Sequence, residues 1–209
     1  AHALLRDQSG VDPERVGLHC VSQGGWVSYL AASMAPATVR QVVAISGPGV
    51  SAAKQERHRL AVLVDDDEEA LAWVDERTER LIAGDDPESI LADQLAHSDR
   101  PWYRVVCDVY VAEWLPFFAR NAAFDPATVL PDVRCPVFAA FGGADATVPV
   151  PQSISRLIEL LPPNPRHAFA VFPNAGHSLC VGQRDSAIPL AEQLAPGFLP
   201  MLSEWFATC

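Results

Sequence analysis

The chain has 209 residues, of which 49% are hydrophobic and 20% are charged, a composition ordinary for a soluble domain that is large enough to bury a core. Its formal net charge of −11 argues against nucleic acid or an anionic membrane surface as a partner. Acidic residues cluster at positions 65–69 and 85–88, and we interpret both clusters as solvated helix starts.

Charge, proline or glycine interrupts each long apolar stretch before the roughly 20 residues that a membrane-spanning helix needs, so no span is predicted. The five cysteines are irregularly spaced and include no C-x-x-C pair, which argues against a zinc site or a disulfide framework. This cysteine usage favours a reducing compartment, and we expect a cytoplasmic location. The chain begins AHALLRD, so any targeting signal is expected to lie upstream.

Residues 1–10 are predicted to end a helix at Gly10, and a first strand follows over Val16–Val21. This strand is apolar throughout, which is typical of a parallel sheet covered by helices on both faces. Ser22 ends the strand, and a helix is predicted over Trp26–Ala35.

Three more buried strands are predicted, over Val39–Gly47, Cys135–Asp145 and Arg166–His177. Apolar residues at helical spacing fill the segment 150–161, between the last two strands. Strands that alternate with helices predict βαβ units with right-handed crossovers, and therefore an α/β fold with a mostly parallel sheet flanked by helices.

The middle of the chain is predicted to be a helical insertion between two core strands. Apolar residues of helical period fill 71–82 and end at Gly84, and Asp86-Pro87 starts another helix. The segment 103–111 fits a strand or a helix equally well. The predicted domains are an α/β core over 1–48 and 132–209 and a helical insertion over 49–131.

The stretch CVSQGG predicts a sharp turn that carries a reactive serine. A strand that ends on Ser22 and passes at once into a helix lifts the serine hydroxyl above the edge of the sheet. Gly24 lets the backbone pass without a Cβ clash, and the Gln23 N–H lies at the positive end of a helix, where it can stabilise an oxyanion.

Serine needs a general base, and the base needs an orienting acid. Asp145 lies in the loop after the third predicted strand, and His177 lies in the loop after the fourth. Reacting groups in open α/β sheets gather at the carboxyl ends of the strands, so these two residues are expected to lie near Ser22.

With these motifs the sequence resembles the α/β-hydrolase family, in its esterase and peptidase-like branch with a helical lid. The resemblance rests on the turn CVSQG, on SGPGVS after the second strand, and on FDP, GGADATVP and FPNAGH. It implies Ser22 as nucleophile, His177 as general base and acid, Asp145 as its orienter and Gln23 as an oxyanion donor. It also implies that the insertion over 49–131 is the lid.

The sequence departs from this family at two points. Cys20 stands where glycine is common in the G-x-S-x-G turn. The family also places several strands before the nucleophile strand, and one of their loops supplies a second oxyanion donor. We therefore expect an incomplete sheet in this chain, which would be the carboxy-terminal part of a longer hydrolase completed by an N-terminal segment or fragment.

Structural alternatives remain for each candidate residue. Ser22 could cap the following helix, and Asp145 could be an ordinary turn residue. The weaker alternative acids are Asp125 and Asp132, and the competing histidines are His19, His97 and His167. We interpret His19 as a core histidine of the first strand and His167 as a residue that opens a strand. Cys20 and Cys180 are expected to be small buried thiols.

Aromatic residues give the insertion a distinct character, and most are expected to hold it together. The candidates for substrate contact are Trp102, Trp114 and Phe117, since pockets for acyl groups are mostly apolar.

The leading functional prediction is a serine hydrolase that cleaves the ester or related acyl bond of a small molecule through an acyl-enzyme, without a metal or organic cofactor. A peptidase, thioesterase, lactonase or C–C hydrolase could use the same three residues. A non-catalytic binding module with the same fold is the alternative from a different class.

Overall fold

The computed structural model describes residues 2–107 and 111–208, and the chain divides into two compact units. One unit comprises Ala1–Gly49 and Pro126–Cys209, and the other comprises Val50–Asp125.

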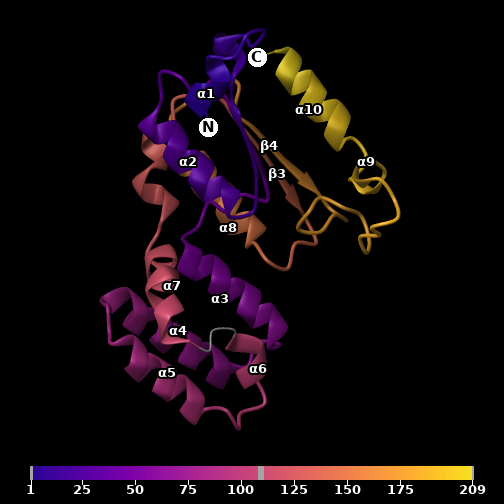
Figure 1. Cartoon of the computed structure of the whole chain (residues 1–209). Coiled ribbons are helices and arrows are strands. Elements are labelled where there is room, and N and C mark those ends of the chain that lie inside the picture. Colours follow the sequence, from indigo (N-terminus) through magenta and orange to yellow (C-terminus); the bar gives the residue numbers. More distant parts are fainter. Residues whose placement is uncertain (1, 108–110, 209) are drawn as a thin grey trace. The chain divides into compact units, whose positions relative to one another are not determined.

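The first unit contains a four-stranded sheet (Figure 1). The strands are β1 (Leu18–Val21), β2 (Val42–Ile45), β3 (Val137–Gly142) and β4 (Ala168–Phe172). They lie in the order β1-β2-β3-β4, and each neighbouring pair runs parallel. The four predicted strands and their parallel arrangement are confirmed, although each strand is shorter than predicted because the ends of the apolar runs form turns.

Helices cover both faces of this sheet. These helices are α2 (Gly24–Met34), α8 (Val150–Leu160) and α10 (Phe198–Ala207). The unit also contains the short helices α1 (His2–Arg6) and α9 (Leu190–Gln193), which have no buried residues. Tyr29 of α2 and Leu157 of α8 pack in one apolar cluster, and Trp205 of α10 packs in a second. Adjacent residues of β2 divide between the clusters, with Val42 in the first and Val43 in the second, because side chains alternate along a strand. The apolar strand β2 is therefore buried on both faces, as its composition predicts.

The second unit is helical. Its helices are α3 (Ala52–Leu63), α4 (Glu68–Ala83), α5 (Pro87–Ala96), α6 (Tyr103–Val106) and α7 (Leu115–Ala122). Asp67 and Asp86 each accept a backbone hydrogen bond as N-cap residues, which confirms that the acidic clusters start helices. Gly84 ends α4 with a left-handed φ of +84°, as predicted.

Two details complete the secondary structure. The ambiguous segment 103–111 begins as helix α6, and residues 108–110 lie outside the described residues. Short 3-10 helices occur at Pro13–Arg15, Ala112–Trp114, Pro126–Thr128 and Leu130–Asp132.

Within the described residues, no helix combines the length and the apolar character that a bilayer crossing requires.

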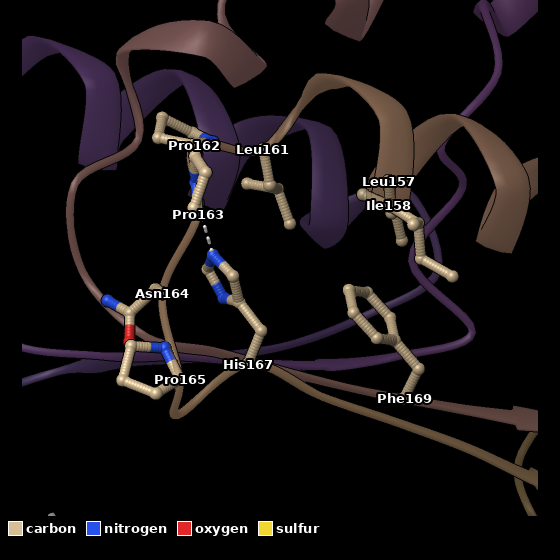
Figure 2. A pocket seen from close by; sticks show the side chains of 9 residues that line it. All are labelled: Leu157, Ile158, Leu161, Pro162, Pro163, Asn164, Pro165, His167 and Phe169. Atoms are coloured by element: carbon tan, nitrogen blue, oxygen red, sulfur yellow. Dashed lines mark hydrogen bonds between the residues drawn. The ribbon is translucent and has the colours of Figure 1, made fainter.

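An apolar groove of about 590 Å³ lies where α8 ends and β4 begins (Figure 2). Its lining residues are Leu157, Ile158, Leu161, Pro162, Pro163, Asn164, Pro165, His167 and Phe169. Figure 2 shows the His167 ring pointing toward the proline-rich segment. The Val137 N–H donates to His167 Nδ1 over 3.1 Å, and His167 Nε2 lies 3.0 Å from the Pro162 carbonyl oxygen, to which it donates. Both ring nitrogens are thus used to join the start of β3 to this segment.

We expect His167→Ala to lower the free energy of unfolding by about 1–3 kcal/mol, because the buried Val137 N–H would lose its acceptor. Urea unfolding followed by circular dichroism measures this change. His19→Ala is the control, since His19 is exposed and should alter stability by no more than about 0.5 kcal/mol. Equal stabilities of the two variants would contradict the structural role of His167.

Candidate active site

Ser22 lies directly after β1 in a strained turn. Its φ is +55°, a left-handed value that costs free energy for a residue other than glycine. The Ser22 N–H donates to the Ile45 carbonyl oxygen of β2 over 2.9 Å, and the Ser22 carbonyl accepts from the Gly25 N–H over 2.8 Å. Gln23, not Ser22, occupies the N-cap position of α2, and no side chain caps this helix. The capping alternative is therefore wrong, and the predicted sharp turn is present.

Glycine is required beside this turn because backbone segments approach closely. A Cβ atom on Gly25 would lie 2.6 Å from Gly47 Cα in the turn after β2. A Cβ atom on Gly24 would lie 3.0 Å from Cys20 Cβ, which is tight but not forbidden. Cys20 therefore fits where glycine is common, since its small side chain leaves room for Gly24.

Cys20 itself has a packing role. The residue is buried, and its thiol donates to the Val43 carbonyl oxygen over 3.3 Å. Burial raises the pKa of the Cys20 thiol above its ordinary value, against a smaller lowering by a hydrogen bond with Ser28. The thiol is thus neutral at physiological pH and is a poor nucleophile. Cys180 is buried as well, as predicted.

Asp145 and His177 form a hydrogen-bonded pair. His177 Nδ1 lies 2.9 Å from Asp145 Oδ2, and the other carboxylate oxygen accepts from the backbone N–H groups of Thr147 over 2.8 Å and Val148 over 3.0 Å. The Asp145 side chain is fully buried, whereas that of His177 is 31% exposed. The structure therefore brings together the predicted acid and the predicted base.

The pKa of Asp145 lies below its ordinary value. Burial raises it, but the hydrogen bond from His177 and the two backbone hydrogen bonds together lower it by more. Asp145 is consequently ionised at neutral pH, which places a proton on His177 Nδ1 and leaves Nε2 free to accept one.

Two glycines at the end of β3 bring the His177 loop back across the sheet. A Cβ atom on Gly142 would lie 2.3 Å from the carbonyl oxygens of Ala175 and Gly176. The Ala144 N–H also donates to the Ala175 carbonyl over 2.9 Å. The loop after β4 thus runs over the end of β3, in the direction of β1. The Gly-Gly pair in FGGAD was the sequence signal for this crossing, and its role was missed.

The three predicted catalytic residues all follow carboxyl ends of parallel strands. Two strands, β2 and β3, separate the strand of Ser22 from the strand of His177. In the described part of the chain, no hydrogen bond joins Ser22 to His177. The structure therefore holds an assembled acid–base pair and a strained serine on the same edge of one sheet. The same described part contains no cluster of three or more His, Cys, Asp or Glu side chains that could hold a metal ion.

The competing residues lie elsewhere. The interpretation of His19 as a core histidine is wrong, because the side chain is exposed on β1 at the edge of the sheet. His97 packs against Trp73 in the helical unit, and its Nδ1 contacts a backbone carbonyl. Asp132 belongs to a 3-10 helix before β3 and faces Arg134 at 3.7 Å.

The three aromatic candidates for substrate contact differ in burial. Trp102 is 4% exposed and packs against Trp73 at a ring distance of 5.4 Å, as a core residue of the helical unit would. Trp114 and Phe117 are exposed by 62% and 56%. Trp102 thus fits the packing alternative. Substrate contacts by Trp114 and Phe117, like the assignment of 49–131 as a lid, stay predictions.

No protein-family model matches the sequence, and no curated protein matches it significantly. Solved structures that are similar to it include three with a TM-score of 0.50 each. Acetyl xylan esterase 1 from Thermoanaerobacterium sp. JW/SL YS485 is 19% identical, and the match covers 99% of this chain and 49% of the esterase. A proline iminopeptidase from Mycobacterium smegmatis is 15% identical, and the match covers 93% of this chain and 67% of the iminopeptidase. A serine hydrolase involved in carbazole degradation is 16% identical, and the match covers 97% of this chain and 68% of the hydrolase.

These likenesses establish the fold. The chain has the α/β-hydrolase fold, with a short parallel sheet that is incomplete. It spans about half the length of the acetyl xylan esterase that it matches.

We expect acid to destabilise the wild type more than Asp145→Asn. The lowered pKa of Asp145 means that the unfolded state takes up its proton first as the pH falls. This contribution to stability is therefore present above the unfolded-state pKa of about 4 and is lost as the pH falls through the lower folded-state pKa. Unfolding by urea between pH 6 and pH 2.5 measures the difference. Equal losses of stability in both proteins would show that the folded state does not favour the ionised carboxylate.

Proposed function

We propose that the chain forms the catalytic part of a serine hydrolase that cleaves a carboxylic ester or a related acyl bond. The observation that carries the proposal is the hydrogen bond between the buried Asp145 carboxylate and His177, on the sheet edge where the strained turn holds Ser22. The acetyl xylan esterase and the serine hydrolase of the same fold support this reaction class.

In the proposed mechanism, Ser22 Oγ attacks the acyl carbon while His177 Nε2 takes the serine proton. The Gln23 N–H, at the start of α2, donates to the oxyanion that develops. His177 then gives its proton to the leaving group, and the acyl group remains on Ser22. A water molecule, deprotonated by His177, releases the acid and restores the serine. Asp145 keeps its negative charge throughout and stabilises the imidazolium.

Other bonds are compatible with the same residues. A peptide, thioester, lactone or C–C bond would need a different substrate pocket but the same nucleophile. One similar structure is that of a proline iminopeptidase, so a peptidase belongs among these alternatives. A non-catalytic binding module would keep the fold without turnover. Labelling of Ser22 by a fluorophosphonate probe distinguishes the enzyme classes from the module.

Ser22→Ala and His177→Ala should each lower the kcat for a short p-nitrophenyl ester by at least about a thousandfold, because neither residue works without the other. Initial rates, with circular dichroism to verify folding, test this expectation. The matched controls are Ser33→Ala and His19→Ala, which change a serine and a histidine outside the candidate site. Activity within tenfold of the wild type in either test variant would refute the assignment.

We also propose that a further strand-bearing segment of the polypeptide, or a fragment cleaved from it, pairs with β1. No strand of the described chain covers the side of β1 that faces away from β2. The helix α2 contacts both β1 and β2, and its residues Val27, Leu30 and Met34 form an apolar face, of which Val27 is 66% and Met34 76% exposed. An open parallel strand beside exposed apolar side chains favours pairing with another strand.

Native mass spectrometry of the protein from its natural source tests this second proposal. We expect either a polypeptide heavier than the 22.6 kDa of this chain or a complex with a second fragment. An active monomer of 22.6 kDa would refute the proposal. Substitution of Met34 by Glu should weaken the association, whereas the same change at Met201, on α10, serves as the control.

A further inference from the structure

Ser46 ends β2 in the same unusual conformation as Ser22. Its φ is +47°, and its N–H donates to the Ala140 carbonyl of β3 over 2.7 Å. Because Val21 of β1 pairs with Ile45 of β2, the two serines follow neighbouring strands at the same level of the sheet. The residue after the strand of Ser22 and the residue after the strand beside it are therefore both strained serines.

The Ser46 hydroxyl is buried without a partner. The residue is 0% exposed, and among the described residues its Oγ has no hydrogen-bond partner. A buried hydroxyl that makes no hydrogen bond costs free energy, and so does a left-handed φ at a residue with a Cβ. Glycine at this position would avoid both costs. This combination points to a use of the hydroxyl in a state other than the unloaded protein.

An unused acceptor lies on the neighbouring strand end. An ionised carboxylate can accept about four hydrogen bonds, and Asp145 accepts three from described residues, two at Oδ1 and one at Oδ2. Its side chain is fully buried, so bulk water does not reach the remaining position on Oδ2. Asp145 follows β3, the strand that pairs with the strand of Ser46. A buried hydroxyl without a partner thus follows β2, and a buried carboxylate with room for one more hydrogen bond follows the neighbouring strand β3.

We propose that Ser46 is a positioning residue of the candidate site, whose hydroxyl donates to Asp145 Oδ2 while His177 carries the proton taken from Ser22. This inference rests on the proposed function. A second donor to Oδ2 stabilises the carboxylate as an anion and fixes its plane. The carboxylate then holds the imidazolium in place without removing the proton from Nδ1.

Two substitutions separate the hydroxyl from the backbone. Ser46→Ala removes the hydroxyl and keeps a Cβ at positive φ, whereas Ser46→Gly removes the hydroxyl and relieves the backbone as well. We expect both variants to lower the kcat for a p-nitrophenyl ester by about tenfold with little change in KM, since a hydrogen bond to a charged group is lost. Ser46→Gly should at the same time unfold at a higher urea concentration than the wild type.

Ser153→Ala is the matched control. Ser153 on α8 is also 0% exposed with an unpaired hydroxyl, and its loss should leave kcat unchanged. A wild-type kcat in Ser46→Gly would overturn the inference, and so would a lower stability of that variant. Fluorophosphonate labelling of Ser22, in the wild type and in each Ser46 variant, distinguishes failure of the Ser46 inference from failure of the proposed function. Labelling with an unchanged kcat rejects the role of Ser46 alone, whereas an unlabelled wild type rejects the proposed function.

Discussion

Close approach of backbone segments at the carboxyl edge of the sheet is the constraint on which the candidate site depends. The His177 loop crosses the end of β3 where a Cβ on Gly142 would lie 2.3 Å from two carbonyl oxygens. The helix after Ser22 starts where a Cβ on Gly25 would lie 2.6 Å from Gly47 Cα. In both places a larger side chain would push a candidate catalytic residue away from the others. The candidate site therefore depends on two close backbone approaches at which a side chain larger than that of glycine does not fit.

The electrostatics of the site follow from the same turn geometry. A fully buried carboxylate is expensive unless hydrogen bonds replace water. The turn after Asp145 folds back so that the N–H groups of Thr147 and Val148 reach one carboxylate oxygen, and the crossing loop brings His177 to the other. One short segment thus supplies both the carboxylate and two of the three hydrogen bonds that it accepts. The charge on Asp145 then decides which nitrogen of His177 carries the proton.

Packing also distinguishes the structural from the candidate functional residues of the same type. Trp102 belongs to a ring cluster with Trp73 and His97 and gives the helical unit a core of its own. Both ring nitrogens of His167 form hydrogen bonds with backbone groups, whereas His177 uses Nδ1 for Asp145 and leaves Nε2 available for chemistry. In each case the contacts and hydrogen bonds that a side chain already makes within the fold, rather than its residue type, distinguish a structural side chain from a candidate functional one.

The sequence by itself determined the places of the four core strands along the chain, their parallel arrangement, the sharp turn at Ser22 and the choice of Asp145 and His177 as candidates. These features follow from local rules, since apolar runs, glycines and the loops that follow strands can be recognised in the sequence. Tertiary structure alone decided that His19 is exposed, because only the strand order places β1 at an edge. It alone also revealed the loop crossing at Gly142 and the unpaired hydroxyl of Ser46. Both arise from contacts between segments distant in sequence, which no local pattern encodes.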